Sequence, residues 1–276
     1  MPSASLNSLC ADARDPARVR QIFADEGLVV IRQALPPAVC GPTAAYLMAA
    51  LEQIADLLAA YGIAPDAPDR GRQVHQLLDS RGAEMPAEDR HVLRGHFPLS
   101  IRLGEELWRI PLHLADHPFL YDILGAKRLF MHMPPTARFV LPGNVEAAVP
   151  AHQDASYYKH LGAFCVVWVP LVDIDGACGG MAAYPRSHGR GELLTGASAA
   201  ADNWLPGIDT SQLERVDLHP LAPGDVVVMS NETVHESMSN RSGRTRLSID
   251  FRFFGDNSRS SKHFLDLAQR RVVAPV

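Results

Sequence analysis

The chain has 276 residues, of which 47% are hydrophobic, and its formal net charge is −5. Such a chain can bury a sizeable core, and its length is compatible with one large, mainly β domain. The acidic balance, without any basic run, argues against a nucleic-acid-binding protein. No uninterrupted apolar segment predicts a membrane span, because Glu52 and Asp56 interrupt the apolar residues 44–60.

The N-terminal residues and the cysteines indicate the compartment that we expect. Residues 1–15 lack the basic-then-apolar layout of a secretory signal. The four cysteines show no C-x-x-C spacing, and Cys165 lies in an apolar run, where a buried thiol is expected rather than a disulfide. These features predict a soluble, cytoplasmic protein.

The first predicted elements are a helix, a strand and a longer helix. Residues 16–26 have a helical pattern that ends at Gly27, a typical stop residue. The β-branched segment 28–32 predicts a short strand, which the following prolines end. Apolar residues then recur at steps of three and four from Thr43 to Tyr61, which predicts a helix closed by Gly62.

The next part of the chain is more polar. Residues 66–94 are rich in Arg, Asp and Glu, and the sequence leaves open whether they form helical cover or a mobile lid. Residues 111–124 resume a helical pattern up to Gly125. We expect residues 66–94 and the later loop 189–220 to shape the mouth of a site.

The second half of the chain changes period and predicts strands at 163–171, 225–230 and 246–254. In the last of these, apolar side chains alternate with polar ones, from Arg246 to Phe253. The polar side would face solvent by default; alternatively it would line the wet interior of a barrel packed outside by helices.

Together these elements predict a mainly β fold with flanking helices. We expect one domain over residues 1–276, with a helical part at about 16–125 and a core at about 126–256. The core is expected to be a jelly roll (a cupin-like double-stranded β-helix) buttressed by the N-terminal helices.

The chemistry begins with an H-x-D motif formed by His152 and Asp154, which occurs once in the chain. Residues i and i+2 of an extended segment point to the same side, so both side chains can reach one ion. Standing alone, such a motif is close to chance expectation, and a loop histidine bonded to a nearby aspartate would be the better explanation.

A third ligand and a cation follow at suitable places. His235 comes soon after the predicted strand at 225–230, and Arg246 lies on the polar side of the last strand. Two histidines and one carboxylate form the facial triad of non-haem Fe(II) oxygenases, which leaves positions open for a keto acid and O2. Arg246 would bind the far carboxylate of the keto acid with its planar fork, and Ser237 could donate a hydroxyl.

The order of these motifs resembles the phytanoyl-CoA dioxygenase (PhyH-like) family of Fe(II)/2-oxoglutarate-dependent oxygenases. The resemblance covers most of the chain, from IFADEGLVVIRQALPP through VPAHQD, VVWVPLVDI, GGMAAYPRSH and LAPGDVVVMSNETVHES to SNRSGRTRLSIDFRF. It implies that His152, Asp154 and His235 bind Fe(II), and that Arg246 anchors 2-oxoglutarate with help from Ser237. O2 would be the oxidant.

Other side chains are weaker candidates. Tyr157 and Tyr158 are expected to flank the iron. Trp168 is expected in the core, with a place in the cosubstrate pocket as the alternative. His132, His188 and the pair His113 and His117 are expected to be structural or solvated. Arg102 and Arg138 are possible partners for the keto-acid end of the cosubstrate.

The expected function is oxidation, foremost hydroxylation, of a small-molecule metabolite or natural-product intermediate, with release of succinate and CO2. Desaturation, epoxidation and ring formation remain open. The alternatives are a cupin-like metal enzyme of non-oxidative type, in which Arg246 is structural, and a non-catalytic binding domain. Neither nucleic acid nor membrane is an expected partner.

Overall fold

The computed structural model describes residues 4–193 and 207–275. Its helices are α1 Pro16–Glu26, α2 Pro37–Ala60, α3 Arg70–Arg81, α4 Ala87–Leu93, α5 Leu99–Arg102, α6 Arg109–Leu114, α7 Pro118–Leu124 and α8 Asp154–Tyr157. Its strands are β1 Cys10–Asp12, β2 Leu28–Arg32, β3 Leu129–His132, β4 Thr136–Val140, β5 Cys165–Pro170, β6 Met181–Ala183, β7 Val216–Asp217, β8 Val226–Ser230, β9 His235–Ser237, β10 Arg246–Gly255, β11 Phe264–Asp266 and β12 Arg271–Val273.

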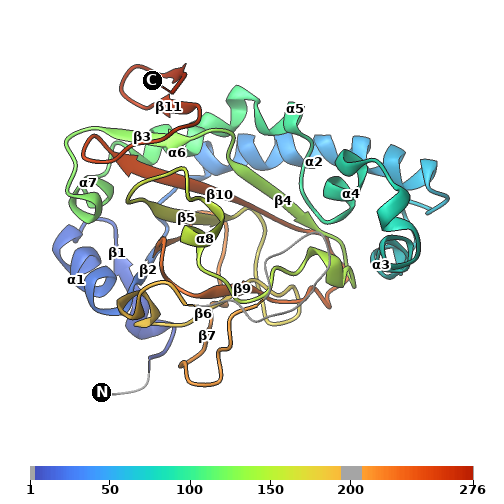
Figure 1. The fold of residues 1–276 in the computed structure, drawn as a ribbon, viewed down its shortest axis with the longest axis horizontal. Coiled ribbons are helices and arrows are strands. Elements are labelled where there is room, and N and C mark those ends of the chain that lie inside the picture. Colours follow the sequence, from blue (N-terminus) through green and yellow to red (C-terminus); the bar gives the residue numbers. More distant parts are fainter. Residues whose placement is uncertain (1–3, 194–206, 276) are drawn as a thin grey trace.

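Two sheets make up the β part of this mixed α/β fold. The large sheet has the order β1-β2-β8-β5-β10-β3-β11-β12, with β4 also paired to β10, and the small sheet has the order β7-β6-β9. All pairs within the large sheet are antiparallel except β1 with β2. In Figure 1 the small sheet lies below the large one, and α8 lies between them.

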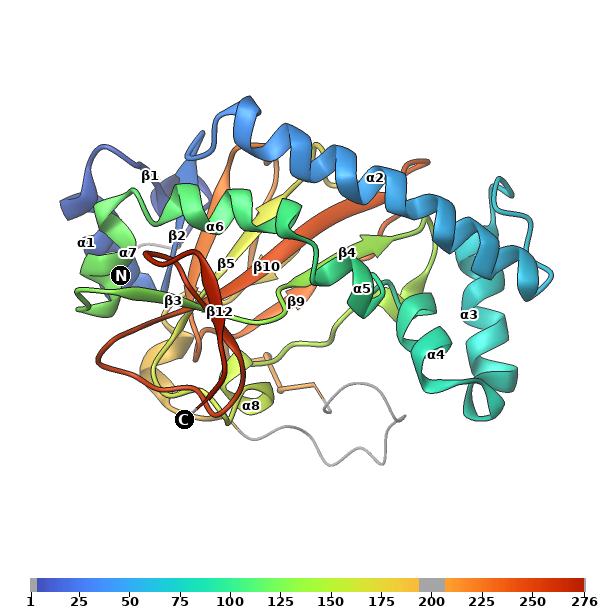
Figure 2. The same cartoon turned by 90° about the horizontal axis from the view of Figure 1, so that it is seen from above.

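The longest helix, α2, extends along the large sheet (Figure 2). Its buried side chains recur at steps of three and four, as expected for one face of a helix packed on a sheet: Cys40, Thr43, Leu47, Ala50, Ile54 and Leu58. By length and composition alone this helix could cross a membrane, a test that core helices of soluble proteins also pass. Within the described residues it contacts α6.

Strand β10 decides between the two sequence interpretations of its polar side. The apolar side chains Leu247, Ile249 and Phe251 are fully buried in the core. The polar side chains on the other face, Arg246, Ser248, Asp250 and Arg252, line a cavity. The default prediction of a solvent-facing side was wrong, and the part of the alternative that placed these side chains along an interior cavity is confirmed.

Most of the helices predicted from the sequence are present, some of them with shifted bounds. Helix α1 and strand β2 are confirmed as predicted, whereas α2 begins at Pro37 rather than Thr43, because a proline fits the first turn of a helix. Residues 66–94 contain α3 and α4, so helical cover is confirmed there. The single helix predicted at 111–124 was wrong: it divides into α6 and α7, since the chain leaves the helical conformation before Pro118.

Candidate metal centre

Three predicted ligand residues meet between the two sheets. His152 lies two residues before the first residue of α8, Asp154 begins that helix, and His235 begins β9. All three are buried, and one ligand atom from each lies within 4.8 Å of the others. The Nε2 atoms of His152 and His235 lie 3.5 Å and 4.0 Å from Oδ1 of Asp154. Among the described residues this is the group able to hold a metal ion.

Hydrogen bonds fix both imidazoles for ligation through Nε2. The Nδ1 atom of His152 lies 2.8 Å from the carbonyl oxygen of Pro150, and that of His235 lies 2.9 Å from the carbonyl oxygen of Thr233. A carbonyl only accepts, so Nδ1 must donate and Nε2 carries the lone pair. Burial, followed by the charge of His152, lowers the pKa of His235 to about 4, which keeps it neutral near pH 7.

The two histidines are also joined through the backbone. The amide of His152 donates to the carbonyl of His235 at 2.9 Å, and the amide of His235 donates back at 3.0 Å. Their ring centroids lie 4.3 Å apart. This isolated antiparallel bridge connects the loop before α8 to the small sheet.

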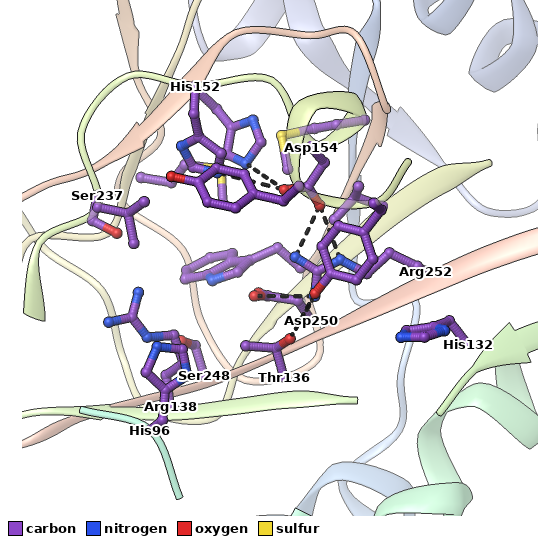
Figure 3. A pocket seen from close by; sticks show the side chains of 18 of the residues that line it. His96, His132, Thr136, Arg138, His152, Asp154, Ser237, Ser248, Asp250 and Arg252 are labelled. Atoms are coloured by element: carbon purple, nitrogen blue, oxygen red, sulfur yellow. Dashed lines mark hydrogen bonds and ion pairs between the residues drawn. The ribbon is translucent and has the colours of Figure 1, made fainter. Parts of the chain in front are cut away.

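The carboxylate of Asp154 is held by Arg252 of β10 (Figure 3). Nε and one terminal nitrogen of Arg252 both lie 2.9 Å from Oδ2 of Asp154, which leaves Oδ1 for a metal ion. Burial opposes ionisation of Asp154, but the charge of Arg252 and the nearby histidines hold its pKa below the usual range. Arg252 also donates to Thr136 at 2.7 Å and lies 3.7 Å from Asp250.

The predicted cosubstrate residues lie on the same cavity, whose volume is about 450 Å³. Arg246 is buried, and it donates to the carbonyl oxygens of Gly179 and Gly180, both at 2.8 Å. Its Nε is buried without a hydrogen-bond partner among the residues that the structure describes. Ser237 lines the cavity as well, and Figure 3 shows it on the His152 side of the site.

The aromatic candidates line this cavity too. Tyr157 packs edge-on against His152, with ring centroids 5.3 Å apart, and the ring of Tyr158 lies 4.4 Å from the guanidinium of Arg252. Trp168 of β5 was expected in the core; it is buried, but it lines the cavity, because its place in the strand puts it on the interior face. The predicted core packing and the alternative place in the pocket are therefore both confirmed.

The remaining histidines named in the sequence analysis lie in different environments. His132 lies on the cavity next to His160 and Tyr158, rather than in solvent. His188 packs by Gly27, 3.2 Å from the carbonyl oxygen of Ala24 and away from the cavity lining. The single helical face assumed for His113 and His117 does not exist, because the chain leaves α6 between them.

Sequence reasoning missed several lining residues. Arg252 was noted as polar but was given no partner, although its place six residues after Arg246 on the same face was a usable signal. His91, His96 and Thr136 also line the cavity, and no local pattern marks them. Arg102 and Arg138, named as possible cosubstrate partners, both lie on it.

Comparison with protein families gives one match that covers most of the chain. Residues 23–248 match the model of the phytanoyl-CoA dioxygenase family (PhyH). The chain belongs to the PhyH family of 2-oxoglutarate-dependent non-haem iron oxygenases. The family resemblance and the expected cofactors, iron and 2-oxoglutarate, are thereby confirmed.

Individual relatives are distant. The 1-deoxypentalenic acid 11-beta-hydroxylase of Streptomyces exfoliatus is 26% identical over 161 residues, which are 54% of this chain and 56% of the relative. The match therefore spans little more than half of that relative's length. A second hydroxylase of the same name, from Streptomyces arenae, matches to the same extent.

Solved structures share the fold. The epimerase SnoN, in complex with Fe3+, alpha ketoglutarate and nogalamycin RO, is 17% identical with a TM-score of 0.57 over 90% of this chain and 86% of its own. The non-heme monooxygenase ThoJ is 21% identical, with a TM-score of 0.56 over 90% of this chain and 83% of its own. EvdO2 from Micromonospora carbonacea, complexed with 2-oxoglutarate, has a TM-score of 0.51 at 18% identity over 88% of this chain and 91% of its own.

The residues of this chain fit the family's cofactors. Two imidazole nitrogens and one carboxylate oxygen are the donor set of an open Fe(II) site. The buried guanidinium of Arg246 can bind a carboxylate, since its Nε still has a hydrogen to donate.

Proposed function

We propose that this protein hydroxylates a small-molecule metabolite or natural-product intermediate while 2-oxoglutarate is converted to succinate and CO2. The observation that carries the proposal is the convergence of His152, Asp154, His235 and Arg246 on one cavity. Two named relatives are hydroxylases of a small organic acid, and SnoN comes from nogalamycin biosynthesis. The presence of Asp154 favours hydroxylation, because a halogenating site needs room for chloride at that ligand position.

Iron, when bound, activates O2 for oxidation of a substrate carbon. The chain holds the metal through His152, Asp154 and His235, with the aspartate oriented by Arg252. Arg246 and Ser237 would hold the far carboxylate of 2-oxoglutarate. Apolar side chains on the cavity wall would bind the substrate and exclude water from the reacting carbon: Leu99, Val149, Val166, Trp168, Met181 and Met229.

The expected jelly-roll core, the single domain and the location in the cell are also part of the proposal. The two sheets are proposed to form a jelly-roll core at about 126–256 within a single domain, supported by the large sheet, the small sheet and the site between them. A cytoplasmic location is proposed, supported by four cysteines that are all free thiols. The loop 189–220, expected at the mouth of the site, is proposed to shape it, and its residues 194–206 lie outside the described part of the chain.

The test is succinate detection with Fe(II), 2-oxoglutarate and O2 across a metabolite library, followed by mass analysis of each compound that raises turnover. The expected result is succinate in proportion to a product that has gained one oxygen. His235→Ala should abolish both signals. If no compound gives succinate and Arg246→Ala leaves any other metal-dependent activity unchanged, the oxygenase assignment fails and the non-oxidative alternative holds.

The same mass analysis separates hydroxylation from desaturation, ring formation and epimerisation. A product two mass units lighter than the substrate would identify desaturation or ring formation, and a product of unchanged mass would identify epimerisation. Neither outcome would alter the assignment of the cofactors. Either would overturn hydroxylation as the reaction of this chain.

A further inference from the structure

One cation that lines the cavity takes no part in the contacts proposed for iron and 2-oxoglutarate. Arg102, the last residue of α5, lines the cavity together with Leu99 from the start of that helix. The residue is half-buried, and its Nε is buried with no hydrogen-bond partner among the described residues. Desolvation lowers the pKa of Arg102, which an adjacent carboxylate would raise.

The carboxylates that line the cavity are engaged elsewhere. Asp154 and Asp250 both face Arg252, at 2.9 Å and 3.7 Å. Glu236 forms an ion pair with Arg215 and accepts a hydrogen bond from Tyr184 at 2.9 Å. Each lining carboxylate thus faces an arginine other than Arg102, with Arg252 shared by Asp154 and Asp250, and Arg102 is left to meet an anion that enters the cavity.

Arg102 shares its part of the cavity with two imidazoles and with a second guanidinium, that of Arg138. His91 and His96 stack with ring centroids 4.0 Å apart, and both line the cavity. Burial, then the positive charges of Arg102 and Arg138, lowers the pKa of His91 to about 4. The pKa of His96 is also lowered well below its usual value, mainly by burial. This end of the cavity is therefore a region of positive potential, in which an imidazole can also donate a hydrogen bond to an anion.

Arg102 and Arg246 serve different parts of the cavity. Arg246, on β10, donates to the carbonyl oxygens of Gly179 and Gly180. Arg102 reaches the cavity from a different element, the end of α5. An anion at Arg102 would thus meet a guanidinium other than the one that would hold the carboxylate of 2-oxoglutarate.

We propose that Arg102, with His91 and His96 beside it, binds an anionic group of the substrate, a carboxylate or a phosphate, while an apolar substrate body extends along the cavity wall towards the iron ligands. This inference rests on the proposed function, because it treats Arg246 as the cosubstrate's anchor. It adds the substrate class: an amphiphilic acid rather than a neutral or cationic compound. A guanidinium flanked by donor groups binds such an anion by charge-assisted hydrogen bonds.

The test uses three probes of similar shape on the protein loaded with Fe(II) and 2-oxoglutarate without oxygen. Cyclohexanecarboxylate and cyclohexyl phosphate carry the anion, and cyclohexanecarboxamide is the neutral match. Calorimetry gives each affinity, and the visible charge-transfer band independently reports that iron and 2-oxoglutarate are bound. Arg102→Gln removes the charge, Arg102→Lys retains it, and Arg20→Gln, an exposed arginine on α1, is the matched control.

The wild type should bind at least one acid about tenfold more tightly than the carboxamide. Arg102→Gln should abolish this preference, Arg102→Lys should keep part of it, and Arg20→Gln should keep all of it. The tighter of the two acids identifies the anionic group. Throughout, the charge-transfer band and the affinity for 2-oxoglutarate should remain those of the wild type.

Two results would overturn the inference. Equal binding of the acids and the carboxamide by the wild type, or no binding of either, would show that the cavity does not select an anion. A large loss of 2-oxoglutarate affinity in Arg102→Gln would place this residue at the keto-acid end of the cosubstrate instead. Failure of the proposed function itself would appear differently, as absence of the charge-transfer band in the wild type.

Discussion

At the level of single residues, Arg252 determines which oxygen of Asp154 faces the metal. Two nitrogens of its guanidinium converge on Oδ2, so Oδ1 is directed at the histidines. Substitution of a residue that orients a metal ligand in this way typically lowers metal affinity by about 10- to 100-fold. Arg252 is thus a positioning residue for the iron site.

Replacing Arg252 should weaken iron binding without unfolding the protein. We expect Arg252→Gln to lower the Fe(II) affinity by about 10- to 100-fold, because the carboxylate loses both its orientation and its counter-charge. Anaerobic equilibrium titration and the charge-transfer band measure this effect, and circular dichroism checks the fold. Arg252→Lys should fall in between, whereas exposed Arg241→Gln is the control. Wild-type affinity in Arg252→Gln would refute the positioning role.

The sequence predicted the metal ligands better than it predicted the residues that hold them in place. His152, Asp154, His235 and Arg246 could be picked out because chemistry restricts their type and because their order along the chain is distinctive. The contact from Arg252 to Asp154 joins segments almost a hundred positions apart, and only the folded sheet brings them together. Arg102 could be named but not placed, since nothing local tells which way a short helix presents its side chains.

At the level of elements, β10 separates two functions on its two faces. Leu247, Ile249 and Phe251 pack into the core, while Arg246, Ser248 and Arg252 face the cavity. A shift of one residue in register would exchange the two sets. Pairing with β4 and β5 on either side prevents such a shift.

Substitutions on the two faces of β10 should therefore have different effects. Phe251→Ala should lower the free energy of unfolding by about 3–5 kcal/mol, because it leaves a cavity at a fully buried site. Arg246→Gln should instead weaken 2-oxoglutarate binding by about tenfold or more. Denaturant unfolding and cosubstrate titration, applied to both variants, check the contrast. Equal losses of stability in the two would contradict it.

Among the elements, long or strongly patterned ones could be predicted and short ones could not. Alternation in β10 and the helical period of α2 each extend over enough residues to stand out. Strands β3, β6 and β9 have only three or four residues, and pairing with distant partners rather than local propensity makes them strands. The small sheet was therefore not predictable in detail.

At the level of the whole molecule, buried neutral histidines should make the metal-free protein sensitive to acid. Burial, then the charge of His160, lowers the pKa of His132 from 6.5 to about 3. Between these values the unfolded chain binds a proton that the native protein does not, so the free energy of unfolding falls as pH decreases through that range. Each such histidine contributes a slope of up to about 1.4 kcal/mol per pH unit.

Denaturant unfolding between about pH 7 and about pH 5 tests this prediction. His132→Gln should reduce the slope of stability against pH, and exposed His263→Gln is the matched control. An unchanged slope in His132→Gln would show that His132 is protonated in the native protein.

Ligands that bind only the folded chain should stabilise it. A redox-inert divalent ion such as Mn(II) at a hundredfold excess over its Kd, with 2-oxoglutarate present, should add about 2.7 kcal/mol to the free energy of unfolding. Differential scanning calorimetry measures the rise in Tm. His235→Ala should lose the effect of the metal, and a rise of the same size in that variant would place the ion elsewhere.

The reciprocal backbone bonds between His152 and His235 have a consequence for when the site exists. They can form only when the loop before α8 has met strand β9, about eighty residues further along the chain. Once these bonds have formed, both imidazoles are held in place, and metal binding requires little further ordering of the chain. A chain in which these bonds have not formed lacks this pairing of the imidazoles, so we expect it to bind iron less tightly than the native protein does.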